Sequence, residues 1–294
     1  RVRARGFSPT ALHLIDKELP PHRATVVPGH EIVGEVVAIG SAVASGRAVP
    51  QYQGGLGFAL GQRVGVPWLG GSCGQCPYCA SDRENLSDAP AFTGWDRDGG
   101  YAEYCVADAR YCLPLPARYD DVHAAPLLCA GLIGWRSWRL AGSALPRRLG
   151  LWGFGAAAHL VCQVAVAHGQ QVFAFTRAGD EASQALALSL GASWAGSSDD
   201  APPGSLDASI LFAPAGELVP AALAASRKGG VVVCGGSHMS TIPAVEYSLL
   251  WGERQLRSVA NLTRTDGREF MAAAERLDLR VQAQAWPLRE ADQA

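Results

Sequence analysis

The segment CGQCPYCASDRENLS, residues 73–87, sets three cysteines at intervals of three residues and a serine eight residues after the last. Thiolate sulfur is a preferred zinc ligand, so this spacing can build a metal site. The other cysteines are scattered among apolar neighbours, which makes a poor disulfide framework. They are Cys105, Cys112, Cys129, Cys162 and Cys234. The pattern favours a metal cluster at Cys73, Cys76 and Cys79 together with buried thiols elsewhere.

A second group of residues could hold a phosphate. The segment LGLWGFGAAAHL contains Gly153-x-Gly155-x-x-Ala158, directly after an apolar run and at the start of a helical pattern. The first glycine permits a tight turn, the second lets the backbone approach a pyrophosphate, and the small Ala158 allows close packing of helix on strand. The free N–H groups of the helix N-terminus then favour the phosphates. The segment predicts a dinucleotide-binding loop.

The residue that reads the ribose is expected at the end of the following strand, roughly 20 residues beyond the glycines. An NAD site would normally present Asp or Glu there, whereas this chain offers Thr176 and Arg177. A guanidinium suits a 2′-phosphate, which favours NADP over NAD. The alternative is that Arg177 only ends the strand in solvent.

The composition narrows the class of protein. The chain has 294 residues, of which 48% are hydrophobic, enough for one large domain or two ordinary ones. Its net charge is −2, with 25 basic and 27 acidic residues and no basic block of the kind that binds nucleic acid or an anionic membrane. No apolar run reaches the roughly 20 residues of a membrane span, and we expect no secretory leader, because no charged-then-apolar segment precedes a small-residue cleavage site. We expect a soluble, cytoplasmic protein with a small-molecule substrate, no nucleic-acid partner and no membrane partner.

The first 130 residues are rich in Gly, Pro and short β-type runs separated by turn signals. This texture predicts an antiparallel or barrel-like β domain. The expected strands lie within 31–40, 62–70 and 101–108, and a long loop is expected at 41–61.

From about residue 130 apolar strands alternate with Ala-rich helical stretches, which predicts a parallel sheet with helices on both faces. Strands are expected at 148–153, 171–176, 206–213, 229–236 and 256–262, and helices at 156–169, 181–192 and 217–230. After residue 263 the texture becomes helical and polar. We interpret 1–130 as one domain, 131–262 as a nucleotide-binding domain, and 263–294 as a truncated segment returning to the first domain. The chain begins with Arg rather than Met, which we read as the sign of a fragment.

The segment VVPGHEIVGEVVAIG places His30 and Glu31 after a Pro-Gly turn at the entrance of a strand. Together with the cysteine cluster, GGYAEY at 99–104 and the nucleotide loop, it resembles the zinc-dependent alcohol dehydrogenases of the medium-chain dehydrogenase/reductase superfamily. The motifs occur in the family's order over nearly the whole chain. The resemblance implies an α/β fold, with a GroES-like β-rich catalytic domain and a Rossmann domain whose parallel sheet is doubly wound. It also implies an active site in the cleft between them and a homodimer or homotetramer.

The resemblance further implies a catalytic zinc that polarises an alcohol or carbonyl oxygen while hydride moves to or from the nicotinamide. His30 matches the family's second zinc ligand, Cys129 in APLLCAGLIGW matches the third, and Glu31 matches the acid beside the zinc. In GFSPTALH, Ser8 stands where the family has its first ligand, a cysteine.

The same segment keeps part of the family's proton relay. Thr10 matches the relay hydroxyl and His13 the terminal relay histidine, whereas a plain reading makes His13 a surface histidine in a loop. With serine in place of a thiolate, the site loses negative charge and gains a hard, poorly acidic ligand. We expect weakened zinc binding, with Glu31 or water filling the open position.

The cysteine cluster matches the family's structural zinc lobe, around residues 73–88. Cys73, Cys76 and Cys79 match three ligands, Ser87 occupies the position of the fourth, and Asp88 is a candidate oxygen donor in its place. The alternative is three reduced cysteines in a loosened loop.

The resemblance predicts an NAD(P)-dependent oxidoreductase that interconverts an alcohol and an aldehyde or ketone with the help of zinc. Two alternatives remain. One is a zinc-independent NADPH reductase of the same superfamily, and its activity would survive chelation. The other is a degenerate homologue that binds nucleotide without turnover.

Overall fold

The computed structural model describes residues 1–16, 18–20, 22–41, 57–143, 148–236 and 238–291, without the side chains of Pro9 and His13. This part of the chain forms two compact units. The first unit combines residues 1–132 with residues 261–294, and the second comprises residues 133–260. The chain therefore leaves the first unit and later returns to it.

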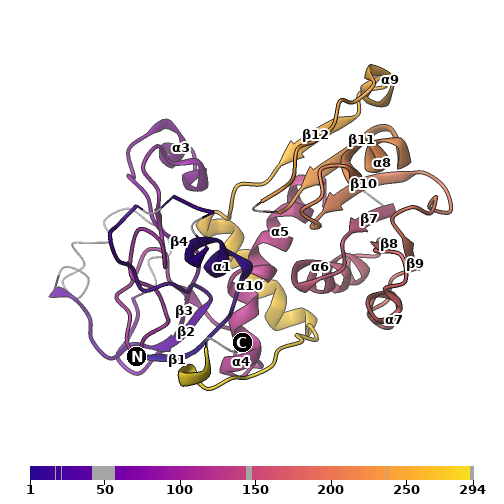
Figure 1. Ribbon diagram of the computed structural model, residues 1–294. Helices are drawn as coiled ribbons and strands as arrows, with labels where there is room; N and C mark the ends of the chain where they lie inside the picture. The colour runs from indigo at the N-terminus through magenta and orange to yellow at the C-terminus, as the bar shows by residue number, and fades with distance from the viewer. Residues whose placement is uncertain (17, 21, 42–56, 144–147, 237, 292–294) are drawn as a thin grey trace. The chain divides into compact units, whose positions relative to one another are not determined.

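The first unit is built on a four-stranded antiparallel sheet (Figure 1). Its strands are β1 (Val2–Arg5), β2 (Ile32–Glu35), β3 (Arg63–Val66) and β6 (Leu113–Pro114), in the order β1-β2-β3-β6. All three pairings are antiparallel. A separate two-stranded ribbon joins β4 (Leu69–Gly71) to β5 (Ala91–Phe92). The β-rich character predicted for this part of the chain is confirmed.

Apolar side chains give this sheet one buried face. Ile32, Val64 and Val66 pack with Phe58 and Cys112 in a single cluster. Ile32 has no exposed surface at all. The cluster holds β2 in place, and His30 and Glu31 immediately precede that strand.

The helices of the first unit are short, apart from α10. They are α1 (Pro9–Ile15), α3 (Pro77–Ala80), η1 (Glu84–Leu86), α4 (Asp121–Ala124), η2 (Ala125–Leu128), α10 (Arg264–Leu277) and η3 (Leu288–Glu290). Proline begins both α1 and α3. Its fixed φ suits the first turn of a helix, where its missing N–H is not needed.

Helix α10 begins with a capping box. The Thr263 hydroxyl accepts the N–H of Asp266 at 3.1 Å, and the Asp266 carboxylate accepts the N–H of Thr263 at 2.9 Å. These reciprocal bonds satisfy two backbone donors that the helix itself leaves open. The sequence predicted a helical segment after 263, and the structure confirms it.

Helix α10 packs tightly on the first unit. A Cβ on Gly131 would lie 2.3 Å from the Phe270 ring, so only glycine fits there. The Tyr119 hydroxyl donates to the carbonyl of Ala274 at 3.0 Å and accepts the N–H of Leu279 at 2.7 Å. These contacts fix residues 264–279 to the first unit.

The second unit contains a six-stranded sheet in which every pairing is parallel. Its order is β12-β11-β10-β7-β8-β9. The strands are β7 (Arg148–Trp152), β8 (Gln171–Thr176), β9 (Trp194–Ser197), β10 (Leu206–Leu211), β11 (Ser226–Cys234) and β12 (Gln255–Ser258). The chain runs outward from β7 to β9 and then resumes on the other side of β7. The loop after β7 therefore lies at the switch point of strand order, where nucleotides bind in such sheets.

Helices connect these strands, as the alternating pattern predicted. They are α5 (Ala130–Leu140), which enters the unit, α6 (Ala156–Ala167), α7 (Glu181–Ser189), α8 (Leu218–Ala225) and the short α9 (Tyr247–Leu250). In the core, the rings of Trp152 and Phe175 stack with their centroids 3.9 Å apart. The predicted α/β fold, a β-rich domain with a parallel-sheet domain, is confirmed. No described helix is both long and apolar enough to span a bilayer.

Two expectations about elements need correction, one holds over a shorter range, and one cannot be judged. Residues 101–108 are not a strand, because Gly99, Gly100 and Tyr101 bond back to the 27–29 turn. The helix expected at 217–230 ends at Ala225, since Ser226 already pairs with Leu206 in the sheet. The run 31–40 is a strand only over β2. Most of the long loop expected at 41–61 lies outside the described residues.

Candidate functional site

Three donor side chains meet in the first unit. One ligand atom each from His30, Glu31 and Cys129 lies within 4.8 Å of the other two. His30 and Glu31 lie directly before β2, and Cys129 lies between η2 and α5. His30 is 2% exposed and Glu31 6% exposed. The structure therefore brings together three of the residues that the sequence suggested, from positions 98 residues apart in the chain.

The backbone before β2 is shaped to present these side chains. Gly29 has φ +96°, a conformation open to glycine, and the Tyr101 ring lies against it. Glu31 itself has φ +64°, which is unusual for a residue with a side chain. Outliers of this kind cost free energy and cluster at functional sites. In this backbone conformation the Glu31 side chain is hydrogen-bonded to Cys129.

Burial keeps the cluster neutral. It lowers the pKa of His30 to about 4. It raises the pKa of Glu31 to about 8, against a smaller lowering effect from the hydrogen bond with Cys129. Burial, followed by the neighbouring Glu31, raises the pKa of Cys129 well above its usual value. The carboxyl group of Glu31 and the thiol of the partly buried Cys129 both have raised pKa values, and a divalent cation beside them would favour both ionised forms.

Ser8 lies beside this cluster. It precedes α1, is 6% exposed, and its Oγ is 3.5 Å from His30 Nε2. A hydroxyl oxygen thus stands next to the imidazole at the position that the resemblance assigned to a ligand. The donor set of imidazole nitrogen, thiol sulfur and carboxylate oxygen is one that zinc accepts. The residues present therefore fit a zinc ion, with an oxygen-richer set than two thiolates and one imidazole.

The two relay candidates both lie on α1. Thr10 is half-buried, two residues after Ser8. His13 is three residues further on, a spacing that puts two positions on one face of a helix. The side chain of His13 lies outside the described part of the structure. The relay stays a prediction.

Gly6 and Tyr101 also shape the site, although the sequence motifs gave neither residue a role. A Cβ on Gly6 would lie 1.5 Å from Glu31 Oε2, so the glycine makes room for the buried carboxyl group. The guanidinium carbon of Arg5 lies 3.0 Å from the centroid of the Tyr101 ring. The Trp68 ring lies 4.8 Å from the His30 ring, edge to face. Gly6 stands two residues before Ser8, and this proximity was the available signal.

The cysteine lobe is a second cluster in the first unit. Cys73, Cys76 and Cys79 place their sulfurs within 4.8 Å of one another, and the sulfurs of Cys73 and Cys79 are 3.8 Å apart. The Ser87 hydroxyl lies 3.3 Å from the Cys73 sulfur and 4.0 Å from that of Cys76. Asp88 is exposed and contributes no oxygen to the cluster, although its N–H donates to the Cys76 sulfur. The structure gives no support to Asp88 as a substitute donor.

Hydrogen bonds favour ionised sulfur in this lobe. The Ser87 hydroxyl is the largest cause that lowers the pKa of Cys73 to about 6, followed by backbone N–H groups of Gln75 and Cys76. Backbone N–H groups of Cys79 and Asp88 lower the pKa of Cys76. A sulfur that accepts several hydrogen bonds holds its negative charge more readily.

The nucleotide loop follows β7 in the second unit. Gly153 has φ +85°, and a Cβ there would lie 2.7 Å from the backbone nitrogen of Ala213. Gly155 begins α6 without a side-chain cap, and a Cβ there would meet nothing within 4 Å. Ala158 is fully buried. The loop thus has a required glycine, an open approach to an uncapped helix N-terminus and a small packing residue, so it fits a pyrophosphate.

The two residues at the end of β8 differ in their surroundings. Thr176 is 4% exposed, and its hydroxyl accepts from Gln184 Nε2 at 2.9 Å and lies 3.3 Å from the carbonyl of Gly196. Its hydroxyl is thus engaged within the fold. Arg177 is exposed just beyond the strand. The structure leaves Arg177 as the candidate for contact with a ribose phosphate.

Comparison with known proteins agrees with this arrangement. The alcohol dehydrogenase GroES-like domain matches residues 1–117. The protein named probable alcohol dehydrogenase AdhA from Mycobacterium tuberculosis (strain CDC 1551 / Oshkosh) is 45% identical over 296 residues, covering 100% of this chain and 82% of that protein.

Two solved structures share the fold. A cinnamyl alcohol dehydrogenase from Sorghum bicolor has a TM-score of 0.84 at 25% identity, covering 98% of this chain and 82% of its own. A zinc-binding dehydrogenase from Sinorhizobium meliloti 1021, bound to NADP, has a TM-score of 0.80 at 26% identity, covering 95% of this chain and 81% of its own. Because the Mycobacterium relative is 45% identical over the whole of this sequence, the chain belongs to the alcohol dehydrogenase family of the medium-chain dehydrogenase/reductase superfamily. This is a family of NAD(P)-dependent oxidoreductases.

Proposed function

We propose that the chain interconverts an alcohol and an aldehyde or ketone, using NADP and a zinc ion held by the first unit. The observation that carries the proposal is the buried cluster of His30, Glu31 and Cys129, whose ligand atoms lie within 4.8 Å of one another. A cluster of nitrogen, oxygen and sulfur donors that is costly to ionise has little structural purpose unless a cation binds to it.

His30 and Cys129 would hold the zinc, with Glu31 as the third protein ligand and Ser8 beside them. When bound, the ion polarises the oxygen of the alcohol or carbonyl substrate. The chain's own contribution is to keep the site dry and its donors fixed. Gly6 leaves room for the Glu31 carboxyl group, and the Trp68 ring covers the imidazole of His30.

Thr10 and His13 are proposed to carry the substrate proton toward solvent. A hydroxyl both donates and accepts, and a histidine changes charge near neutral pH, so the pair can pass a proton along α1. The position equivalent to the family's relay carboxylate is Ala11, which is buried. The relay would therefore run without help from a carboxylate at that position.

The second unit would bind the cofactor. The N-terminus of α6 would face the pyrophosphate, and the exposed Arg177 would pair with the 2′-phosphate of NADP. Replacing Arg177 by Gln should raise the KM for NADPH about tenfold and leave the KM for NADH nearly unchanged. Equal effects on both cofactors would refute the preference for NADP. A homodimer or homotetramer also stays a prediction, to be checked by sedimentation.

The function is tested by zinc-loaded assays of a panel of aldehydes with NADPH and NADH. Because the Sorghum neighbour is named a cinnamyl alcohol dehydrogenase, the panel should include cinnamaldehyde with benzaldehyde and short aliphatic aldehydes. Cys129→Ser should abolish turnover while NADPH still binds, and Cys105→Ser, a partly buried thiol of the same unit, is the matched control.

Three results separate the alternatives. Turnover that survives both chelation and Cys129→Ser would identify a zinc-independent reductase. NADPH binding without turnover, even after zinc loading and in the Ser8→Cys variant, would identify a nucleotide-binding homologue. Turnover that rises with zinc, and at lower zinc concentration in Ser8→Cys, supports the proposed site and its weakened metal affinity.

A further inference from the structure

The Ser87 hydroxyl has no spare hydrogen-bonding capacity. It accepts the N–H of Cys73 at 3.2 Å and the N–H of Ala89 at 3.3 Å, and it donates to the Cys73 sulfur at 3.3 Å. A hydroxyl has one proton to donate and two lone pairs to accept with, so all three are in use. To bind a cation, the oxygen would have to release one of these partly buried backbone N–H groups, which costs a hydrogen bond.

The lobe therefore does not fit the closed, four-ligand zinc site that the family implies. Structural zinc sites hold the ion with four thiolate or imidazole ligands. Here the fourth position carries the neutral Ser87 hydroxyl, whose hydrogen bonds are all in use. The nearby Asp88 carboxylate is exposed and lies outside the cluster. The hydrogen bond from Ser87 to Cys73 joins the two ends of the lobe, which a shared metal ion would otherwise join.

Without a metal, the sulfurs of two of these cysteines are in contact and free to react. Those of Cys73 and Cys79 are 3.8 Å apart, van der Waals contact for sulfur. Cys73 is only partly buried, whereas Cys79 is buried, so a small oxidant meets Cys73 first. Rotation of the side chains has to close the distance from 3.8 Å to the roughly 2.05 Å of a disulfide.

We propose that Cys73 and Cys79 are a peroxide-oxidised dithiol, and that this lobe is an oxidation site instead of a structural zinc site. In the first step the Cys73 thiolate attacks one oxygen of a hydroperoxide. The O–O bond breaks, Cys73 becomes a sulfenic acid, and the released hydroxide or alkoxide takes up a proton. In the second step the Cys79 sulfur attacks the Cys73 sulfur, the S–O bond breaks, and water leaves with the Cys79 proton. Two thiols lose two electrons in total, and the peroxide gains them.

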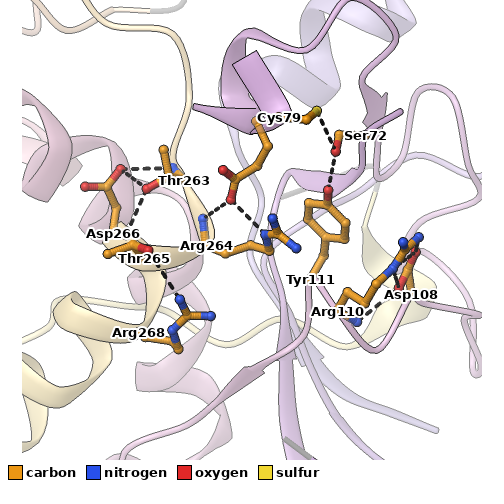
Figure 2. A network of polar contacts seen from close by, with 11 residues as sticks. Ser72, Cys79, Asp108, Arg110, Tyr111, Thr263, Arg264, Thr265, Asp266 and Arg268 are labelled. Atoms are coloured by element: carbon orange, nitrogen blue, oxygen red, sulfur yellow. Dashed lines mark hydrogen bonds and ion pairs between the residues drawn. The ribbon is translucent and has the colours of Figure 1, made fainter. Parts of the chain in front are cut away.

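The disulfide would change a buried network next to the lobe. The Cys79 thiol donates to Ser72 Oγ at 3.3 Å, and Ser72 Oγ is bonded to the Tyr111 hydroxyl at 2.5 Å (Figure 2). The Arg264 guanidinium lies 5.1 Å from the centroid of the Tyr111 ring. Oxidation removes the thiol proton, so Ser72 loses this donor. The effect should reach the start of α10, where Arg264 lies.

The test uses the reduced 294-residue chain, first saturated with zinc, desalted and counted for metal. It is then treated with a few equivalents of hydrogen peroxide, alkylated and mapped by mass spectrometry. Chymotrypsin cleaves after Tyr78 and so separates Cys79 from Cys73 and Cys76. We expect a disulfide joining the two peptides in the wild type and in Cys76→Ser, the matched control, and none in Cys73→Ser or Cys79→Ser.

Two further variants keep the test decisive if one of these fails to fold. Cys79→Ser lacks the resolving thiol, so dimedone should trap a sulfenic acid on its Cys73. Ser87→Cys restores a fourth thiol, so it should retain about one more zinc per chain than the wild type after desalting. Its zinc-loaded lobe should react with peroxide at least tenfold more slowly. Because both comparisons concern only the lobe, they do not depend on turnover or on metal at the His30 cluster.

The proposal is overturned if the wild type and Ser87→Cys retain the same amount of zinc and are equally protected from peroxide. It is also overturned if peroxide produces a disulfide that Cys76→Ser abolishes, or a sulfinic acid on Cys73 without any disulfide. Melting curves before oxidation should match for wild type and Cys76→Ser, which confirms that the control is folded.

Discussion

Gly6 is the residue on which the geometry of the donor cluster depends most directly. Its N–H donates to the carbonyl of Glu31 at 3.1 Å, and a Cβ there would overlap Glu31 Oε2. Gly6→Ala should lower the free energy of unfolding by about 1–3 kcal/mol, the usual cost of overpacking. It should also weaken zinc binding, because the carboxyl group has to move. Gly40→Ala is the control, since a Cβ there meets nothing within 4 Å.

Urea unfolding and zinc titration check this prediction. If Gly6→Ala and Gly40→Ala unfold at the same urea concentration, the carboxyl group is not confined as described.

The Glu31 carboxyl group makes stability depend on pH in the metal-free protein. Its pKa rises from an ordinary 4.5 to about 8 in the fold, so between these values the folded state keeps a proton that the unfolded state has lost. Stability therefore falls as pH rises through this window, and from pH 6.5 to 8 the loss is about 2 kcal/mol. The pKa of His30 falls to about 4, so its opposing effect is confined to lower pH.

Glu31→Gln removes the titrating carboxyl group and keeps a side chain of nearly the same size. The difference in unfolding free energy between wild type and Glu31→Gln, measured with chelator present, cancels other groups, including the Cys73 thiol with its lowered pKa. The wild type should lose stability relative to the variant between pH 6.5 and 8. A difference that stays constant would show that Glu31 is ionised in the folded protein.

Among the elements, α10 depends on a buried ion pair with η1. Arg264 donates through its backbone N–H at 2.7 Å and its Nε at 2.8 Å to the same oxygen of Glu84. The side chains are 8% and 2% exposed. Arg264→Met leaves a buried carboxylate without its charged partner, so the free energy of unfolding should fall by about 3–5 kcal/mol.

Adding Glu84→Gln to Arg264→Met should restore much of this loss, because the remaining side chain no longer carries a charge. Arg268→Met, four residues along the same helix, is the control, since its bond to Thr265 is exposed. Denaturant unfolding of the four proteins measures the effect. A double variant that is less stable than Arg264→Met would contradict this account.

The elements also show how far sequence reasoning reaches. The strand 171–176 was predicted to the residue, since a buried parallel strand is an apolar run between a glycine turn and a polar end. The helix expected to 230 was wrong beyond Ala225, because pairing with β10 decided the conformation of Ser226. Pairing of this kind joins distant residues and leaves little local signal.

In the candidate sites, too, residues within local motifs were predicted, whereas contacts between distant residues were not. His30 and Cys129 were recognised from their motifs. The role of Gly6 was not, because its effect on Glu31 arises only when a loop and a turn 25 residues apart come together. The sequence also does not show that every hydrogen-bonding position of the Ser87 hydroxyl is occupied, since two of its three hydrogen bonds come from backbone N–H groups.

At the scale of the whole molecule, the first unit is discontinuous and the second is continuous. The first unit needs α10, because Phe270 packs against Gly131 and the carbonyl of Ala274 accepts the Tyr119 hydroxyl. A chain that ends at residue 260 should therefore lose the cooperative unfolding of the first unit and keep that of the second. The second unit has a core of its own, which includes Trp152, Phe175 and Val232.

Hydrogen exchange distinguishes the two units peptide by peptide. Strong protection of β7, β8 and β10 together with rapid exchange of β2 and β3 is the expected result. A chain that ends at residue 287, and so keeps α10, is the control and should protect both units. Full protection of β2 and β3 in the shorter chain would contradict the dependence on α10.

The discontinuity also orders events while the ribosome makes the protein. Residues 133–260 contain everything their own core requires, so they can acquire structure as soon as they leave the exit tunnel. The nascent first unit, by contrast, lacks the Phe270 ring that packs against Gly131 until residue 270 is translated. During that interval the apolar surface meant for α10 is exposed, and a chaperone that binds apolar segments would find its target there.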